Sequence, residues 1–567
     1  MGLSAAAPWL KYYGNTPASL EYPHKTMYEM VEAAAKRHPN HVAYVFMGKK
    51  TSYTEFMKRI QAAAQGLYKM GIRKGDKVTI CMANTPQALD CFYALNRIGA
   101  IPNMIHPLSA SQEIAFYLNF SKSKAILTLD QFYYKVAEIL PQLENPTEIL
   151  IAKVVDELPA PLRALYPLTK TARAVKKLPK AGYTLWYDMV KAGKNTRLPD
   201  QKSRYDSCGA ILYSGGTTGT TKGIMLSNLN FNALALQTIA ASGFSMEEIS
   251  NMKMLSVMPV FHGFGLGIGI HTPLVAGGTC ILIPQFNVKV YAKTLMKQKP
   301  NLIPGVPTLF EALLRTEDLE GADLSFLKGI FSGGDSLSPE LKKKVDAFLR
   351  EHNCSEQIRE GYGTTECVTA SCLTPKDYAR QGSIGVPFPD TYYKIVEPGT
   401  TNEVGPNIEG EICISGPTVM LGYMDNPYET ANTLRRHAGA VPADRLWPHS
   451  VRLLRRRSGH RRGSGRPGQG PAQPGRHHVR HQAQGRPLPG NGRRLCSQNR
   501  AGQGRPDLRL PVPLSGQDDG RHQEGHVPQR GLREEHRHLR PVQGRGRRGS
   551  VDRPAQAVIG GAGNVFV

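Results

Sequence analysis

The last 133 residues of this 567-residue chain contain no lysine, since Lys394 is the final one. They hold only two of the chain's 43 aromatic residues, Trp447 and Phe566, and a single isoleucine. No window in this stretch keeps the apolar period of a helix or a strand. A segment so poor in apolar side chains cannot bury enough surface to offset its conformational entropy. We therefore expect residues 435–567 to form a disordered tail behind a folded region that ends near residue 434.

Two further absences bear on location. No apolar run reaches the length that spans a membrane, and the first residues lack the apolar core of a secretory signal. The nine cysteines are scattered without a C-x-x-C pair, which indicates reduced thiols rather than a disulfide framework. These features predict a cytoplasmic protein without a transmembrane segment and leave peripheral membrane contact open.

The formal charge of +25 is unevenly distributed along the chain. Residues 435–567 contain 27 arginines and 8 acidic residues, whereas the first 434 residues carry 44 basic and 38 acidic ones. A strongly basic balance is typical of nucleic-acid binders, but here the excess belongs to the tail. The first 434 residues have the charge of an ordinary globular protein, so we expect no specific nucleic-acid partner.

Glycine and threonine are concentrated in Tyr213–Gly223, which reads YSGGTTGTTKG. Ala210–Tyr213 predicts a buried strand before it, and Ser227 or Asn228 is placed to cap a helix over Leu229–Ala241. A flexible strand-to-helix loop of this kind can wrap a polyphosphate with backbone N–H groups, hydroxyls and a lysine. The predicted phosphate contacts are Ser214, Gly215, Gly216, Thr217, Thr218, Gly219, Thr220 and Lys222.

Two other interpretations of this loop are a Gly/Thr-rich surface turn without a ligand and the P-loop of nucleotide-binding proteins. The P-loop pattern fails by position, because Thr221 precedes Lys222 where glycine is required and Gly223 follows where serine or threonine is required.

Strand and helix patterns alternate through most of the chain, which is typical of a parallel α/β sheet. Predicted strands are Lys77–Cys81, Ile101–Met104, Ala125–Thr128, Gly278–Ile283, Tyr393–Val396 and Gly410–Gly416, and predicted helices include Met27–Arg37, Thr54–Met70, Gln87–Ile98 and Val288–Gln298. Residues 155–205 are more basic and less periodic, and we interpret them as an insertion or surface meander.

Three shorter motifs follow the loop. PVFHGFG at 259–265 contains His262, and a lone histidine of this kind is more often a core residue than a ligand. SGGD at 332–335 follows a strand pattern, and GYGTTE at 361–366 ends in a carboxylate. Tyr362 can stack on a base, Thr365 can donate to a phosphate, and Glu366 can hold Mg²⁺ against phosphate oxygens.

In this order the motifs resemble those of the adenylate-forming superfamily of acyl-CoA synthetases, peptide-synthetase adenylation domains and luciferases. The resemblance covers residues 25–434, ends with G-Y-x-x-x-P-x-x-T at 422–430, and is strongest to bacterial medium- and long-chain fatty-acid–CoA ligases. It implies an adenylation domain over 1–434, with two stacked α/β subdomains at 25–205 and 206–380. A partial, β-barrel-like subdomain is implied at 381–434.

The resemblance also implies a reaction. ATP and a carboxylic acid give acyl-AMP, and CoA then displaces AMP, so ATP, Mg²⁺, CoA and a fatty acid are the expected ligands. The implied catalytic residues are Thr217, Lys222, His262 and Glu366, with Thr217 and Glu366 on the metal. Implied nucleotide contacts also include Gly333, Gly334, Gly361, Tyr362, Gly363, Thr364 and Thr365, and the implied acyl pocket contains His262, Phe264, Gly265, Val306, Gly334 and Gly361.

The C-terminal part departs from the family. The resemblance leads us to expect a T-G-D whose aspartate binds ribose, a hinge, and a small mobile α+β domain with a catalytic lysine. Residues 446–453 read LWPHSVRL where T-G-D should fall, and the tail has no lysine. The tail is a natural arginine-rich extension that binds nucleic acid, an unusual folded domain, or a family C-terminus translated in the wrong frame. The Arg/Gly/Pro excess favours the last.

We therefore expect a fatty-acid–CoA ligase whose activity is impaired in this chain. An adenylation enzyme that loads a carrier protein is the enzymatic alternative, and a catalytically dead acyl- or nucleotide-binding protein is the alternative of another class. Acyl chain length and oligomeric state are left open by the sequence.

Overall fold

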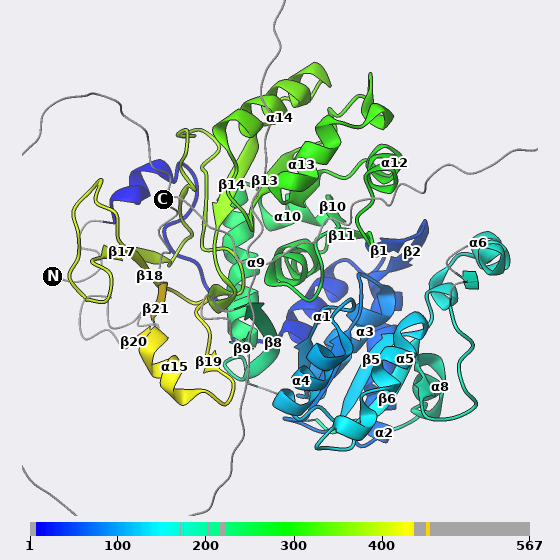
Figure 1. Cartoon of the computed structure of the whole chain (residues 1–567). Helices are drawn as coiled ribbons and strands as arrows, with labels where there is room; N and C mark the ends of the chain where they lie inside the picture. The colour runs from blue at the N-terminus through cyan, green and yellow to red at the C-terminus, as the bar shows by residue number, and fades with distance from the viewer. Residues whose placement is uncertain are drawn as a thin grey trace, which may run out of the picture. The chain divides into compact units, whose positions relative to one another are not determined.

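Two large β-sheets carry most of the chain, with helices packed on both faces of each sheet (Figure 1). The predicted mixed α/β class is confirmed. The computed structural model describes residues 7–169, 172–173, 175–200, 204–215, 221–435 and 450–453. None of the helices in these ranges is long and apolar enough to cross a membrane.

The first sheet has eight strands within the described residues. In spatial order they are β19 (Gly422–Tyr423), β9 (Thr221–Ser227), β8 (Cys208–Gly215), β4 (Ile101–Met104), β3 (Lys77–Cys81), β5 (Ala125–Leu129), β6 (Glu148–Ala152) and β7 (Thr184–Leu185). The strands from β8 to β7 run parallel, and β9 and β19 join antiparallel at one edge.

The second sheet has nine described strands. In spatial order they are β16 (Val386–Pro387), β15 (Cys372–Leu373), β14 (Ile358–Tyr362), β13 (Gly329–Ser332), β12 (Leu302–Gly305), β10 (Lys253–Ser256), β11 (Thr279–Leu282), β1 (Val42–Phe46) and β2 (Lys49–Ser52). Strands β1 and β2 come from the first part of the chain, whereas β8 and β9 of the first sheet come from the middle. The sheets therefore exchange strands between the ranges 25–205 and 206–380, and the predicted subdomain boundaries stay a prediction.

Helices fill three layers around these sheets. The α-helices are α1 (Met27–Arg37), α2 (Tyr53–Lys69), α3 (Pro86–Arg97), α4 (Ser111–Ser121), α5 (Tyr133–Ala137), α6 (Ala160–Leu165), α8 (Trp186–Ala192), α9 (Asn228–Ser242), α10 (Met246–Ser250), α11 (Thr272–Ala276), α12 (Val288–Gln298), α13 (Pro307–Leu314), α14 (Pro339–Glu351) and α15 (Pro427–Thr433). The one π-helix among the described residues is η6 (Phe264–His271), and the short 3₁₀ helices include η4 (Val154–Glu157) and η8 (Thr365–Cys367).

The cores follow from the alternation of side chains along each strand. In β5, Ala125 and Leu127 face the central core with α1, α2 and α3, whereas Ile126 faces a second core with α4 and α5. Helices α12, α13 and α14 cover the outer face of the second sheet in a third core. Both faces are buried, which explains why these parallel strands read as short continuous apolar runs.

Local signals at several helix ends are confirmed. The Thr26 side chain accepts a hydrogen bond from the Glu29 backbone N–H, and the Glu29 carboxylate accepts one from the Thr26 N–H, forming a capping box at α1. Ser338 caps α14 in the predicted way, with proline in the first turn.

The phosphate loop is not a strand-to-helix connection, and that prediction is wrong. Residues 216–220 connect β8 to β9. These two strands pair antiparallel, from Gly215 opposite Thr221 to Cys208 opposite Ser227. Helix α9 begins only after β9. Ile224 and Leu226 are fully buried, so this segment gains more by completing the sheet than by starting a helix. No helix N-terminus follows the loop directly.

Two predictions about irregular segments also change. Residues 155–205 are not merely a meander, because β7 extends the first sheet and Trp186 of α8 is buried against the central core. The predicted β subdomain is an antiparallel sheet, in the order β17 (Tyr392–Val396), β18 (Glu411–Ser415), β21 (Ser450–Leu453) and β20 (Leu434–Arg435). Within the predicted tail, Ser450–Leu453 pairs with the edge of β18, whose backbone groups even a four-residue strand can bind. The rest of the predicted tail lies outside the described residues.

Candidate active site

The carboxyl ends of β13 and β14 bring together most of the described residues that the sequence predicts to contact a nucleotide. Gly333 and Gly334 follow β13, and Gly361 and Tyr362 end β14. Gly334 has φ +79°, a conformation that favours glycine. A Cβ on Gly333 would lie 3.4 Å from the Gly361 carbonyl oxygen, which is an ordinary contact, so the two strand ends lie close together. The backbone of both ends lines one hollow, the crevice. Ligands of parallel α/β sheets commonly bind at such strand ends.

A polar network connects this crevice to β9 and β19. Glu366 lies in η8, and its Oε1 accepts a 2.9 Å hydrogen bond from the Tyr423 hydroxyl. The Lys222 Nζ lies 4.9 Å from the centre of the Tyr423 ring and donates a 2.6 Å hydrogen bond to Glu429 Oε2. Two predicted residues, Glu366 and Lys222, are therefore joined through Tyr423, which the sequence had not assigned a role.

Tyr423 and Glu429 are held by the last motif of the sequence. The Thr430 hydroxyl accepts a 2.9 Å hydrogen bond from the Tyr423 N–H and donates a 2.8 Å one to the Asn426 carbonyl. Gly422 has φ +145°, and a Cβ there would meet Thr430 at 2.9 Å. This explains the spacing of glycine, tyrosine and threonine in the motif, and that spacing was the signal that could have identified Tyr423.

The residues around Glu366 fit a magnesium ion. No cluster of three or more His, Cys, Asp or Glu side chains suited to a metal occurs among the described residues. Mg²⁺ is usually held by one or two carboxylates plus substrate phosphates, so one carboxylate is enough. Only one Glu366 oxygen is engaged by a described residue, at Tyr423. Thr217, the other predicted ligand, lies outside the described residues with Gly216, Thr218, Gly219 and Thr220.

The turn after Glu366 is strained. Val368 has φ +65°, and the Thr369 N–H donates a 2.7 Å hydrogen bond to the Cys367 carbonyl across it. This γ-turn conformation is rare for a β-branched residue. The Val368 carbonyl oxygen packs against Gly263, and the Thr369 carbonyl oxygen packs against Gly363. A Cβ on either glycine would clash with the carbonyl oxygen beside it. The strained turn thus connects Glu366 to the PVFHGFG motif, through the contact between Val368 and Gly263.

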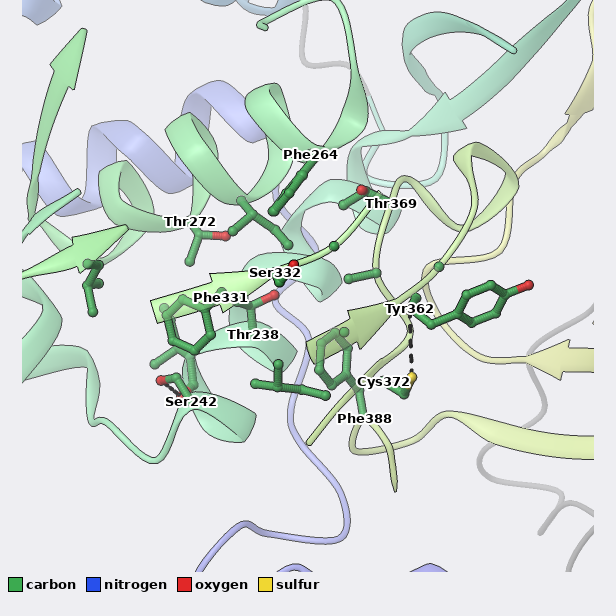
Figure 2. Close-up of a pocket in the computed structure, with 18 of the residues that line it drawn as sticks. Thr238, Ser242, Phe264, Thr272, Phe331, Ser332, Tyr362, Thr369, Cys372 and Phe388 are labelled. Carbon is green, nitrogen blue, oxygen red and sulfur yellow. Dashed lines mark hydrogen bonds between the residues drawn. The ribbon is translucent and has the colours of Figure 1, made fainter. Parts of the chain in front are cut away.

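An apolar cavity opens beside the same crevice (Figure 2). The cavity volume is about 60 Å³, and the empty space together with the open solvent at its mouth is about 710 Å³. Its lining includes Phe264, Gly334 and Gly361, which were predicted for the acyl pocket, and Gly333, which was predicted for the nucleotide. The other lining residues are Thr238, Ile239, Ser242, Ile249, Met254, Ile268, Thr272, Leu302, Phe331, Ser332, Tyr362, Gly363, Thr369, Ala370, Cys372, Leu373 and Phe388. No charged side chain occurs among these residues. In Figure 2 the Tyr362 ring points away from the cavity, so only the rest of the residue forms its wall.

Three residues predicted for the acyl pocket are not in this lining. His262 precedes η6, Gly265 packs against the backbone of Pro259, and Val306 stands behind Gly334. Helix η6 carries Phe264 and Ile268, which line the cavity. Glycine stands at every second position from 263 to 269, and atoms of other segments pack closely against Gly263, Gly265 and Gly267. The functional roles predicted for His262, Gly265 and Val306 stay predictions.

The environment of His262 favours its uncharged form at neutral pH. Burial, followed by the nearby His106, lowers the pKa of His262 to about 4. The ring lies 4.8 Å from that of Phe261, which in turn lies 4.4 Å from His106. At neutral pH the imidazole is therefore a neutral donor or acceptor and does not supply positive charge to a carboxylate.

The scaffold and the contacts at its strand ends define a class: α/β proteins that bind a ligand in the crevice beyond the carboxyl ends of parallel strands. Comparison with known families makes the assignment specific. Residues 31–424 match the family described as AMP-binding enzyme, and the chain belongs to that family.

Individual relatives agree with this assignment. The chain is 33% identical over 440 residues to the long-chain-fatty-acid–CoA ligase of Bacillus subtilis (strain 168), which covers 76% of this chain and 77% of that protein. It is 27% identical over 400 residues to 4-coumarate–CoA ligase 1 of Solanum tuberosum, covering 69% and 68%. In fold it is similar to the crystal structure of a long-chain-fatty-acid–CoA ligase from Archaeoglobus fulgidus, with a TM-score of 0.63, 23% identity, and coverage of 74% and 80%.

The Glu366 network gives a testable expectation. Glu366→Gln keeps the shape but removes the charge, so Mg·ATP should bind about tenfold more weakly, the loss of one charge-assisted contact. Tyr423→Phe leaves the carboxylate without its donor and should weaken binding by a smaller factor. Isothermal titration of the full chain with Mg·ATP measures both.

Ser338→Ala, which removes the cap of α14 away from the network, is the matched control. Unchanged Mg·ATP affinity in Glu366→Gln would remove this residue from the metal site.

Proposed function

We propose that this chain is an acyl-CoA ligase that activates a fatty acid with ATP and transfers it to CoA. The observation that carries the proposal is the uncharged cavity that opens beside Gly333, Gly361 and the Glu366 network. The similarity to fatty-acid–CoA ligases supports the same substrate class.

The chain's own residues would divide the work as follows. The bare backbone at Gly333 and Gly361 lets the carboxylate and the α-phosphate approach each other closely. Lys222 and the loop donors offset the phosphate charge, and Tyr423 and Glu429 orient Lys222 meanwhile. Glu366 and Thr217 would hold Mg²⁺, which neutralises charge on the phosphates when bound. Such preorganised donors stabilise the transition state without a covalent nucleophile.

The length of the acyl chain tests the substrate class. Each buried methylene contributes about 0.8 kcal/mol, or roughly a fourfold gain in affinity, until the cavity is full. Isothermal titration of the full chain with Mg·ATP and a series of acids from acetate to dodecanoate should show this steady gain. A preference for acetate would contradict a fatty-acid substrate, and a preference for an amino acid would favour an enzyme that loads a carrier protein.

We also propose that the chain as it stands turns over slowly or not at all. The support is the composition of 435–567, which offers neither a lysine nor a T-G-D. A binding protein without catalysis would show the same acyl-chain series in titration. Unlike an impaired ligase, it would form no acyl-adenylate even when a relative's C-terminal segment replaces residues 435–567, so that replacement separates the two proposals.

A further inference from the structure

Two buried hydroxyl groups in the wall of the apolar cavity have no hydrogen-bond partner among the described residues. They belong to Ser332, the last residue of β13, and Thr238 of α9, and both oxygens are fully buried. Figure 2 shows both side chains in the central part of the cavity, near the rings of Phe331 and Phe388. Buried polar atoms are almost always paired in folded proteins, so an unpaired couple in one cavity needs an explanation.

Two further hydroxyls of the cavity lining, unlike this pair, are hydrogen-bonded to backbone carbonyls and so have a structural role. Ser242 donates a 2.6 Å hydrogen bond to the Ile239 carbonyl, and Thr272 donates a 2.9 Å one to the Gly267 carbonyl. The Ile239 carbonyl belongs to the same helix as Ser242, and the Gly267 carbonyl belongs to η6, which leads directly into α11. Ser332 and Thr238 do not turn back in this way, although helical threonine often bonds to the preceding turn. Neither oxygen is bonded to a described residue.

The position of the pair indicates where along an acyl chain a partner would lie. Ser332 directly precedes Gly333 at the crevice, where the carboxylate end is proposed to react. Ile249, Met254 and Leu302, which line the same cavity, form an apolar cluster with Ile239, the residue after Thr238. An acyl chain that reacts at Gly333 and extends to this cluster would pass the two hydroxyls partway along its length.

The lining also restricts the kind of polar group. None of the lining residues is charged, so a second carboxylate on the substrate would be desolvated without a counter-charge. A hydroxyl or carbonyl group costs far less to bury and can bond to both side chains, since each hydroxyl is donor and acceptor.

We propose that the cavity selects fatty acids with a neutral polar substituent, a hydroxyl or a keto group, within the acyl chain. Ser332 and Thr238 are the residues that recognise it. This inference rests on the proposed function and narrows its substrate class. A site built to bond a substrate hydroxyl discriminates against the analogue that lacks it, because the protein groups then stay unpaired.

Titration of the full chain with Mg·ATP and a set of acids of equal length tests the proposal. The probes are dodecanoate, hydroxydodecanoates with the hydroxyl at successive positions, one ketododecanoate and the dodecanedioate. We expect one hydroxyl position to bind at least about tenfold more tightly than dodecanoate, and the dodecanedioate to bind most weakly.

Paired variants assign the effect to residues. Ser332→Ala and Thr238→Val should each lower the preference for the hydroxylated acid severalfold, and the double variant should abolish it. The matched controls Ser242→Ala and Thr272→Val remove hydroxyls that are already bonded, so the preference should stay. In the absence of ligand, Ser332→Ala should melt at the same or a higher temperature than the unchanged chain, because it removes an unpaired buried group.

The outcomes are distinct. Equal affinity for all hydroxylated acids and dodecanoate would overturn the inference and leave the fatty-acid ligase standing. A preference that survives in the double variant would overturn the assignment to Ser332 and Thr238. Absence of binding for every acid would contradict the proposed function itself, and the inference with it.

Discussion

A chimera that joins residues 1–434 to the C-terminal segment of the Bacillus subtilis relative is expected to form acyl-adenylate at least about a hundredfold faster than the chain itself. Loss of one preorganised donor where charge develops typically costs about 10²–10³ in rate. A ribose-binding aspartate adds charge-assisted hydrogen bonds of roughly 1.5–3 kcal/mol. The resemblance assigns both groups to the segment that 435–567 replaces, and closure by a mobile domain would also exclude water from the site.

The measurement is pyrophosphate release with and without dodecanoate, for both proteins at equal concentration. The chimera with Glu366→Gln is the control, because it keeps the new segment and removes the proposed metal ligand. Equal turnover by the chain and the chimera would show that residues 1–434 suffice. The roles assigned to the missing lysine and aspartate would then have to be abandoned.

Elements with strong local signals were predictable from the sequence. Lys77–Cys81 and Ile101–Met104 have the predicted bounds, and so do α1 and α12. Short apolar runs between turn residues, and amphipathic stretches with a capping residue, determine such elements locally. The partners of the strands were not predictable, because pairing is a property of distant segments. Strand β1, for example, lies between β2 and β11, more than two hundred residues away, with Tyr44 opposite Cys280.

The same contrast between local signals and distant contacts applies to the candidate site. Motifs with unusual composition revealed Glu366, Gly333 and Lys222, since glycine and isolated charge are conspicuous in a sequence. The sequence showed Tyr423 as part of a motif but gave it no role, because its hydrogen bond with Glu366 spans 57 residues. The hydroxyls of Ser332 and Thr238 were not singled out, because nothing in a sequence tells an unpaired hydroxyl from a paired one.

Replacement of Arg59 by methionine is expected to lower the free energy of unfolding by about 3–5 kcal/mol. Arg59 on α2 donates hydrogen bonds of 2.9 and 2.6 Å to Asp90 Oδ2 on α3, and one of 2.6 Å to Glu157 Oε1 in η4. The two carboxylate residues are only 2% and 1% exposed. Tyr187 of α8 also donates to Glu157, and Lys49 Nζ lies 3.9 Å from Glu157 Oε2. The guanidinium therefore joins α2, α3 and η4 directly, and α8 is joined to them through Glu157. Without it, two buried like charges face each other.

Acid should partly rescue the variant, and this separates charge from packing. Burial raises the pKa of Asp90 to about 6 even with Arg59 present, and loss of the guanidinium raises it further. The folded variant then binds protons that the unfolded chain does not, so its free energy of unfolding rises as the pH falls from about 7 to 5. The control Lys36→Met breaks an exposed pair with Glu32 and should cost at most about 0.5 kcal/mol. The midpoint of urea unfolding by tryptophan fluorescence measures all three proteins. A loss in Arg59→Met that stays constant across this pH range would mean that the methylene stem, not the charge, supports the layer.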